Sequence, residues 1–176
     1  MLSLLNIKIK EHLKYLSKCV IIIQRGDTMS YKIVELNEED SCFATMTLSI
    51  PDYSRALHKR AVASMKKELA RMGVEVSDEA YDFSIAQSNE DNIEVVEIEI
   101  YVRTKELGED TASIKFKEIP SCGKMIRVIA DDFADVHTGL AEWMHENDAM
   151  ENGQLRQVVT DLAPYVFDSP VRPSDD

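Results

Sequence analysis

Hydrophobic and polar residues alternate along several short segments of the chain, which is the pattern of half-buried β-strands. In the first half this alternation predicts four strands, at residues 31–36, 43–50, 81–86 and 93–102, which form two pairs, each joined by a turn. Between the second and third strands the apolar residues recur at helical spacing. Pro51 and Asp52 indicate the start of this helix, and Gly73 indicates its end near Met72. The predicted order is therefore strand, strand, helix, strand, strand.

The same order recurs in the second half of the chain. Strands are predicted at 113–119, 124–129, 155–160 and 165–171, with a helix that Asp131 and Asp132 cap. The helix starts also match, Asp52-Tyr53-Ser54 in the first half and Asp132-Phe133-Ala134 in the second. This self-similarity predicts an α+β fold of two pseudo-symmetric repeats, which form an antiparallel sheet with both helices on one face. The free face of the sheet, or the seam between the repeats, is where we expect a concave site.

Residues 1–28 form a basic leader that differs from the rest of the chain. Its apolar residues recur at helical spacing, and lysines lie on the other face of this predicted helix. Two interpretations stay open. The leader is either a relic of a linker helix from a DNA-binding head, or an upstream segment that precedes a translation start at Met29. The main domain is predicted over 29–171, and 172–176 form a tail. We expect no DNA-binding head in this chain, since it shows no helix-turn-helix pattern.

The net charge of the chain limits the kinds of molecule that it is expected to bind. The chain carries 20 Lys and Arg against 32 Asp and Glu, a formal net charge of −12, and the basic leader leaves the main domain more acidic still. Such a field repels phosphate backbones, so we expect no direct contact with nucleic acid. The acidity either serves solubility alone or steers cations toward the protein. The 3 cysteines form no paired motif and no apolar run spans a bilayer, which predicts a cytoplasmic protein without membrane contact.

Three stretches of the second half carry a family resemblance. Ile-Lys-Phe-Lys-Glu-Ile-Pro at 114–120, the aromatic Phe133, and Leu-Ala-Glu-Trp-Met-His-Glu-Asn at 140–147 resemble the GyrI-like effector-binding domain. This domain occurs at the C-terminus of MerR-type and AraC-type regulators and as a free-standing protein. The first half resembles it more loosely, at 31–36 and 96–102. The resemblance implies a pocket between the repeats for flat, apolar and often cationic molecules, in which aromatic rings and a buried carboxylate hold the ligand.

One departure from the family concerns this carboxylate. The family commonly has a pattern like Arg-Glu-x-Tyr after the second helix, whereas this chain has Arg156-Gln157-Val158-Val159. The resemblance therefore implies that Gln157 contacts the ligand, but as a glutamine it lacks the negative charge of the family's glutamate. Either the ligand is neutral, or another carboxylate has taken the role.

The strand at 93–102 offers a replacement carboxylate. Its alternation places Val96, Ile98, Ile100 and Val102 on one face, which we expect to pack under the helices. Glu97, Glu99 and Tyr101 lie on the other face. That face is either an ordinary solvent-exposed surface or a pocket wall, on which a glutamate meets a ligand cation and Tyr101 stacks on it.

Four further aromatic residues are candidate ligand contacts. Trp143 is predicted on the core side of the second helix, where it either fills the core or also lines the cleft. Tyr53 and Phe133 stand at the two helix starts, where they either reach a shared pocket or staple each helix entry. Tyr165 on the last strand completes the set of candidates.

No motif of a nucleophile, a phosphate loop, a metal site or a cofactor site is present, so we expect neither catalysis nor a cofactor. The leading hypothesis is a stand-alone module that binds a cationic, amphipathic small molecule. One alternative is an acidic, protein-binding inhibitor of a DNA-acting enzyme such as gyrase. Another is a small-molecule hydrolase, in which Glu97 or Glu99 acts as general base. A protein partner or a homodimer stays open.

Overall fold

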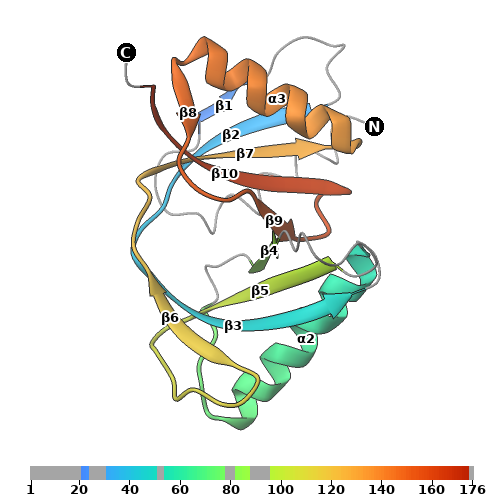
Figure 1. The fold of residues 1–176 in the computed structure, drawn as a ribbon, viewed down its shortest axis with the longest axis vertical. Helices are drawn as coiled ribbons and strands as arrows, with labels where there is room; N and C mark the ends of the chain where they lie inside the picture. Colours follow the sequence, from blue (N-terminus) through green and yellow to red (C-terminus); the bar gives the residue numbers. More distant parts are fainter. Residues whose placement is uncertain (1–20, 24–30, 51–53, 78–81, 88–95, 175–176) are drawn as a thin grey trace. The chain divides into compact units, whose positions relative to one another are not determined.

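The computed structural model describes residues 21–23, 31–50, 54–77, 82–87 and 96–174. The chain is an α+β protein whose strands pair antiparallel (Figure 1). It divides into two compact units. Unit 1 comprises Met1–Glu39, Cys122–Leu155 and Thr160–Asp176, and unit 2 comprises Asp40–Ser121 and Arg156–Val159. Each unit is described by itself below.

In unit 1 one helix covers a strand layer. Its strands are β1 (Ile21–Ile23), β2 (Tyr31–Asn37), β7 (Lys124–Ala130), β10 (Tyr165–Pro173) and β8 (Ala149–Glu151), and its helix is α3 (Phe133–Glu146). β2 and β10 flank β7, β1 pairs with β2, and β8 pairs with β10. Asp132 caps α3 as predicted, because its side chain accepts a hydrogen bond of 2.8 Å from the Ala134 amide.

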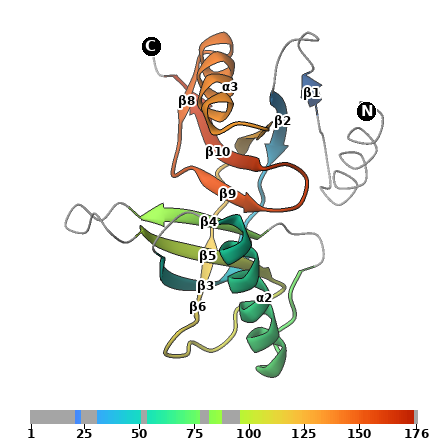
Figure 2. The same ribbon diagram turned by 90° about the vertical axis from the view of Figure 1, so that its right-hand side faces the viewer.

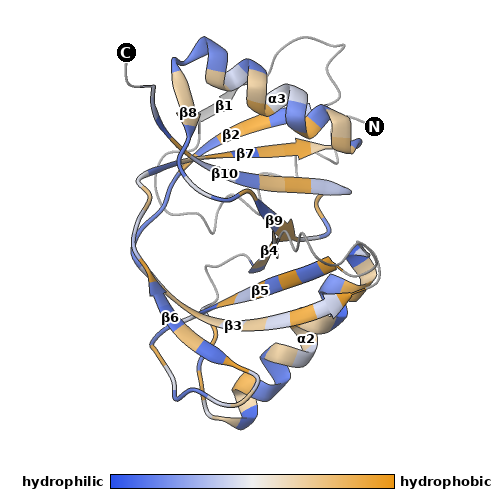
Figure 3. Ribbon diagram, in the orientation of Figure 1, coloured by the Kyte–Doolittle hydropathy of each residue, from blue (hydrophilic) through white to orange (hydrophobic). Residues whose placement is uncertain are grey.

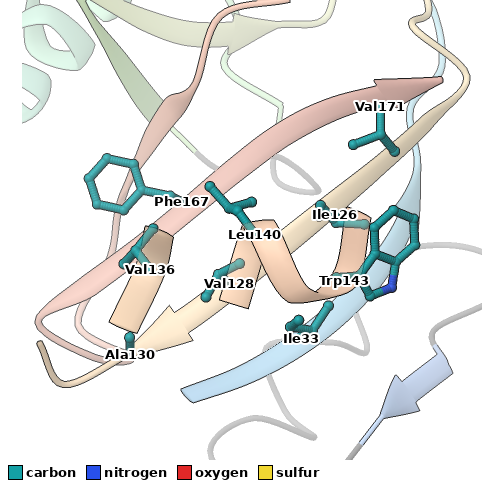
Figure 4. Packing of buried hydrophobic residues seen from close by; sticks show 9 residues of the cluster. All are labelled: Ile33, Ile126, Val128, Ala130, Val136, Leu140, Trp143, Phe167 and Val171. Atoms are coloured by element: carbon teal, nitrogen blue, oxygen red, sulfur yellow. The ribbon is translucent and has the colours of Figure 1, made fainter. Parts of the chain in front are cut away.

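The core of unit 1 lies between α3 and the strands (Figure 4). Val136, Leu140 and Trp143 of the helix meet Ile126 and Val128 of β7. These helix residues recur three or four positions apart, so one stripe of α3 faces the sheet. Figure 3 shows polar residues interleaved with the apolar ones along α3, as an amphipathic helix requires.

Unit 2 has the same layered construction. Its strands follow the order β9 (Arg156–Val159), β4 (Asp82–Gln87), β5 (Val96–Thr104), β3 (Ser41–Ile50) and β6 (Lys115–Ile119). The helix α2 (Arg55–Arg71) packs along one face (Figure 2). Met65 and Leu69 of α2 belong to one buried hydrophobic cluster with Ile98, Ile100 and Val102, which confirms the predicted apolar face of the strand at 93–102.

The pairing of neighbouring strands differs from the sequence prediction. Residues 31–36 and 43–50 were expected to form two strands joined by a turn, yet β2 pairs with β7 and β3 pairs with β5 and β6. The two strands therefore belong to different units, as do β6 and β7. Alternation within a strand shows which face is apolar, but it carries no information on the partner strand. The pseudo-symmetric duplication stays a prediction.

The helix prediction for the first half is confirmed from residue 55 onward. α2 ends at Arg71 and Gly73 follows it with a φ of 76°, a left-handed conformation that favours glycine after a helix. The expected start at Pro51 and Asp52 and the basic leader to residue 20 lie outside the described residues. Among the described helices none is long and apolar enough to cross a membrane.

Candidate functional site

The face of the unit 2 sheet that points away from α2 carries a group of aromatic side chains. Tyr101 of β5 lies opposite Phe83 of β4, and their rings stack with centroids 4.4 Å apart at an angle of 12°. Phe43 of β3 meets both rings edge-on, at 5.3 and 5.9 Å. Phe83 is 0% exposed and Tyr101 5%. The interpretation of this face as an ordinary solvent-exposed surface is therefore wrong at Tyr101.

A carboxylate and a lysine adjoin these rings. The Tyr101 hydroxyl donates a hydrogen bond of 2.5 Å to Glu99 Oε2, and Lys117 Nζ of β6 lies 2.9 Å from Glu99 Oε1. The same Nζ lies 2.9 Å from the Tyr101 hydroxyl oxygen and 4.5 Å from the centre of its ring. We call Phe43, Phe83, Glu99, Tyr101 and Lys117 the Tyr101 cluster.

The protonation states in this cluster follow from its contacts. Burial alone disfavours both charges, but the hydrogen bonds and the opposite charge hold the pKa of Glu99 below and the pKa of Lys117 above its usual value. A further hydrogen bond from Thr45 helps to lower the pKa of Glu99. Burial and the hydrogen bond to Glu99 raise the pKa of the Tyr101 hydroxyl, which therefore keeps its proton. At neutral pH the cluster contains one carboxylate, one ammonium and one neutral phenol.

A second cation stands at the far end of the stacked rings. The guanidinium carbon of Arg156 on β9 lies 5.0 Å from the centre of the Phe83 ring. Since the strand order runs β9, β4, β5, β3, β6, the side chains form a column in the order Arg156, Phe83, Tyr101, Lys117. Arg156 is buried, with 7% exposure, whereas the Lys117 side chain is 40% exposed. The two cations thus differ in how easily they leave the rings.

The predicted site residues of β5 and β9 do not all reach this column. Glu97 shares the face of Glu99 by strand alternation and is half-buried, and it forms no ion pair with any described residue. Gln157 lies on the opposite face, because it pairs with Ser84 while Val158 pairs with Phe83. Ser84 Oγ lies 3.3 Å from His58 Nδ1 of α2, and burial lowers the pKa of that histidine. Gln157 therefore belongs to the helix-covered side, apart from the Tyr101 cluster.

Phe133, Trp143 and Tyr165, three of the remaining candidates, lie in unit 1. Phe133, at the start of α3, is 44% exposed and contacts the rings of Tyr165 at 5.8 Å and Phe167 at 5.6 Å. Trp143 is 3% exposed in the core, as core packing predicted, and Lys124 Nζ lies 4.9 Å from the centre of its ring system. Tyr53 lies outside the described residues.

Sequence reasoning found Glu99 and Tyr101 but missed Phe43, Phe83, Lys117 and Arg156. Because side chains alternate along a strand, the sequence of β6 shows that Lys115 and Lys117 share one face of it. The missing information was the pairing of β6 with β3, which joins segments far apart in the sequence. Within the described part of the chain, no group of three or more His, Cys, Asp or Glu residues is placed to hold a metal ion.

Comparison with known proteins supports the fold. The sequence matches no protein-family model, and no curated protein matches it. The crystal structure of the EcmrR C-terminal domain shares the fold with a TM-score of 0.63 at 17% identity, over 82% of this chain and 99% of that domain. EcmrR in a complex with DNA gives a TM-score of 0.64 at 16% identity, over 97% of this chain and 65% of EcmrR.

A hydrolase from Listeria innocua also shares the fold, with a TM-score of 0.53 at 12% identity over 83% of this chain and 94% of the hydrolase. At such low identities these likenesses show the fold alone. They show that this chain has the fold of the EcmrR C-terminal domain.

Proposed function

We propose that this chain is a small-molecule-binding module and that the Tyr101 cluster of unit 2 is its ligand-binding site. One observation carries the proposal. A partly buried, ionised carboxylate is hydrogen-bonded to one member of a stacked aromatic pair, on the sheet face opposite the helix of unit 2. A strand that serves packing alone does not need a carboxylate beside aromatic rings. A binding site for an organic cation needs the carboxylate as counter-charge and the rings as an apolar, cation-attracting surface.

The ligand class follows from these two elements. Aromatic faces attract cations through the ring quadrupole, and Glu99 supplies the counter-charge. We infer an amphipathic cation whose charged group contacts Glu99 and the Tyr101 ring. The net charge of −12 adds long-range attraction for such a molecule. By the likeness in fold to the C-terminal domain of EcmrR, a protein that forms a complex with DNA, we propose a role as an effector-binding module in regulation.

We propose binding rather than catalysis. A general base works best with a pKa near the working pH, and the contacts of Glu99 move its pKa the other way. Glu99 is therefore a poor base for hydrolysis as long as Tyr101 and Lys117 hold it. A cytoplasmic location stays a prediction, and a protein partner or a homodimer stays an open alternative.

Three probes with one aromatic skeleton test the proposal: 1-naphthylmethylammonium, 1-naphthylmethanol and 1-naphthoate. We expect only the ammonium to raise the melting temperature and to give heat in a calorimetric titration. Glu99→Gln should weaken the binding of this probe by about tenfold or more, because the charge-assisted contact is lost.

Glu97→Gln is the matched control. It removes the same charge from the same face of β5, two residues away and outside the cluster. We expect its affinity for the ammonium probe to stay within about twofold of the wild type, since Glu97 makes no direct contact with the cluster and a charge without a contact contributes little. Absence of binding by the ammonium, or equal affinity in the Glu99 variant and the wild type, would overturn the proposal.

A protein-binding inhibitor is a second candidate, and the acidic net charge favours it. Capture of a DNA-acting enzyme from cell lysate that weakens as salt rises would support that function, because salt screens long-range attraction between charged surfaces.

A further inference from the structure

Lys117 makes the contacts that an organic cation would make in the proposed site. Its ammonium nitrogen lies 2.9 Å from Glu99 Oε1, 2.9 Å from the Tyr101 hydroxyl oxygen and 4.5 Å from the Tyr101 ring centre. Counter-charge, hydrogen-bond acceptor and aromatic face are therefore all occupied by the chain's own lysine. A ligand cation has no free place in the cluster while this lysine stays.

Lys117 is also the member of the cluster that is able to leave. Its side chain is 40% exposed and that of Glu99 is 18% exposed, whereas Tyr101 as a whole is 5% exposed and Phe83 is 0% exposed. A lysine has a long, flexible stem, and a partly exposed ion pair contributes little net stability. Arg156 at the other end of the column is buried, so its exchange would uncover no accessible ring.

We propose that Lys117 is a resident cation of this site, and that the cognate ligand is a protonated amine that takes the place of the lysine ammonium. This inference rests on the proposed function of the Tyr101 cluster. The ammonium contacts two oxygen atoms through N–H groups, and those oxygens need a donor when Lys117 departs. A protonated amine restores both contacts, whereas a quaternary ammonium restores the charge and the ring contact only.

The competition sets a threshold for binding. A ligand gains only the difference between its own contacts and those of the lysine that it displaces. The apolar part of the ligand must supply this difference, so small cations such as ammonium or lysine itself are excluded. The resident lysine thus makes the site selective for amines with an aromatic or aliphatic body.

The decisive variant is Lys117→Met, which keeps a chain of similar length and removes the ammonium. We expect 1-naphthylmethylammonium to bind this variant roughly five to ten times more tightly than the wild type, because the internal competitor is gone. Lys115→Met is the matched control. Lys115 lies on the same face of β6 and carries the same charge, but its ion pair is with Asp110. Its affinity should stay within about twofold of the wild type.

A second probe tests the ligand class, the N-trimethylated analogue of the same naphthylmethyl amine. We expect it to bind more weakly than the primary ammonium in both wild type and Lys117→Met. Equal or stronger binding of the trimethylated probe in both would overturn the assignment of a protonated amine. Lys117→Gln provides a second variant without the ammonium, in case the methionine variant folds poorly.

The outcomes separate this inference from the function on which it rests. If the wild type binds the ammonium, Glu99→Gln weakens that binding as expected and neither Lys117 variant binds more tightly, the resident-cation proposal is wrong and the proposed function stands. If neither the wild type nor any variant binds the probe, both are wrong. Tighter binding by the Lys117 variants, with Lys115→Met unchanged, supports the proposal.

Discussion

Each unit carries an ion pair on the sheet face that points away from its own helix, and the two pairs differ sharply in burial. In unit 1, Arg127 of β7 donates two hydrogen bonds to Asp168 of β10, at 2.6 and 2.7 Å, and the two side chains are 1% and 0% exposed. In unit 2, Lys117 meets Glu99 through one oxygen at 2.9 Å, with 40% and 18% exposure. One pair is closed off, and the other is partly open to solvent.

This difference assigns different roles to two similar contacts. A buried, bidentate pair has no solvent to replace a lost partner, so neither group exchanges without a large cost. A partly exposed lysine has water as its alternative and leaves at little cost. The closed pair therefore fixes the register of β7 against β10, where Arg127 and Asp168 lie directly opposite each other. The open pair is suited to exchange with a ligand.

The largest expected effect comes from breaking the closed pair. Arg127→Met leaves the Asp168 carboxylate buried without its counter-charge, and we expect a loss of about 3–5 kcal/mol in the free energy of unfolding. Urea unfolding followed by circular dichroism measures it. The double variant Arg127→Met with Asp168→Leu should recover most of this loss, because no charge then stays buried. A single variant as stable as the wild type would show that the pair is not locked.

A smaller effect is expected from Tyr101→Phe, which keeps the ring and removes the hydroxyl that donates to Glu99 and accepts from Lys117. The free energy of unfolding should fall by about 1 kcal/mol, the usual net contribution of a hydrogen bond. In the Lys117→Met background, where no lysine competes for the same acceptor, affinity for the naphthylmethyl ammonium should fall about threefold, since the ring contact stays and one acceptor is lost. An unchanged affinity in calorimetry would show that the Tyr101 hydroxyl does not contact the ligand.

The sequence correctly predicted features that depend on a single strand or helix, such as which residues share one face. The alternation of 93–102 correctly placed Ile98 and Ile100 under a helix, and it placed Glu99 and Tyr101 together on the other face. It did not reveal that Lys117 meets them, because that contact depends on β6 pairing with β3 across a long sequence separation. The same lack of information led to the wrong pairing of β2 with β3.

Gln157 shows a second limit. Its position after the second helix matched the family pattern, yet strand pairing turns it to the side of Ser84 and α2. Only the register against β4 decides which of two adjacent residues faces the aromatic column, and a shift by one residue reverses the outcome. Motif position therefore predicted the strand but not the direction of the side chain.

The pH dependence of binding sharpens the role of the open pair. The folded-state pKa of Glu99 lies below its usual value, so its charge is fully present above the usual carboxylate range. It is lost only as pH falls through the lowered pKa. Affinity for the ammonium probe should therefore hold from neutral pH to about pH 5 and decline below about pH 4.5, while the probe itself stays protonated. In Glu99→Gln the same titration should be flat, and a decline near pH 6 would point to another group.

The smallest effect on stability is expected from Lys117→Met, which is the same kind of substitution as Arg127→Met made in the open pair. Its free energy of unfolding should change by less than about 1 kcal/mol, because water reaches Glu99 and takes over part of the lost contact. Unfolding both methionine variants in urea under one set of conditions compares the two pairs directly. If the Lys117 variant lost as much as the Arg127 variant, the lysine would be as firmly held as the arginine. Exchange with a ligand amine would then be too costly, and the two ion pairs would serve the same structural purpose.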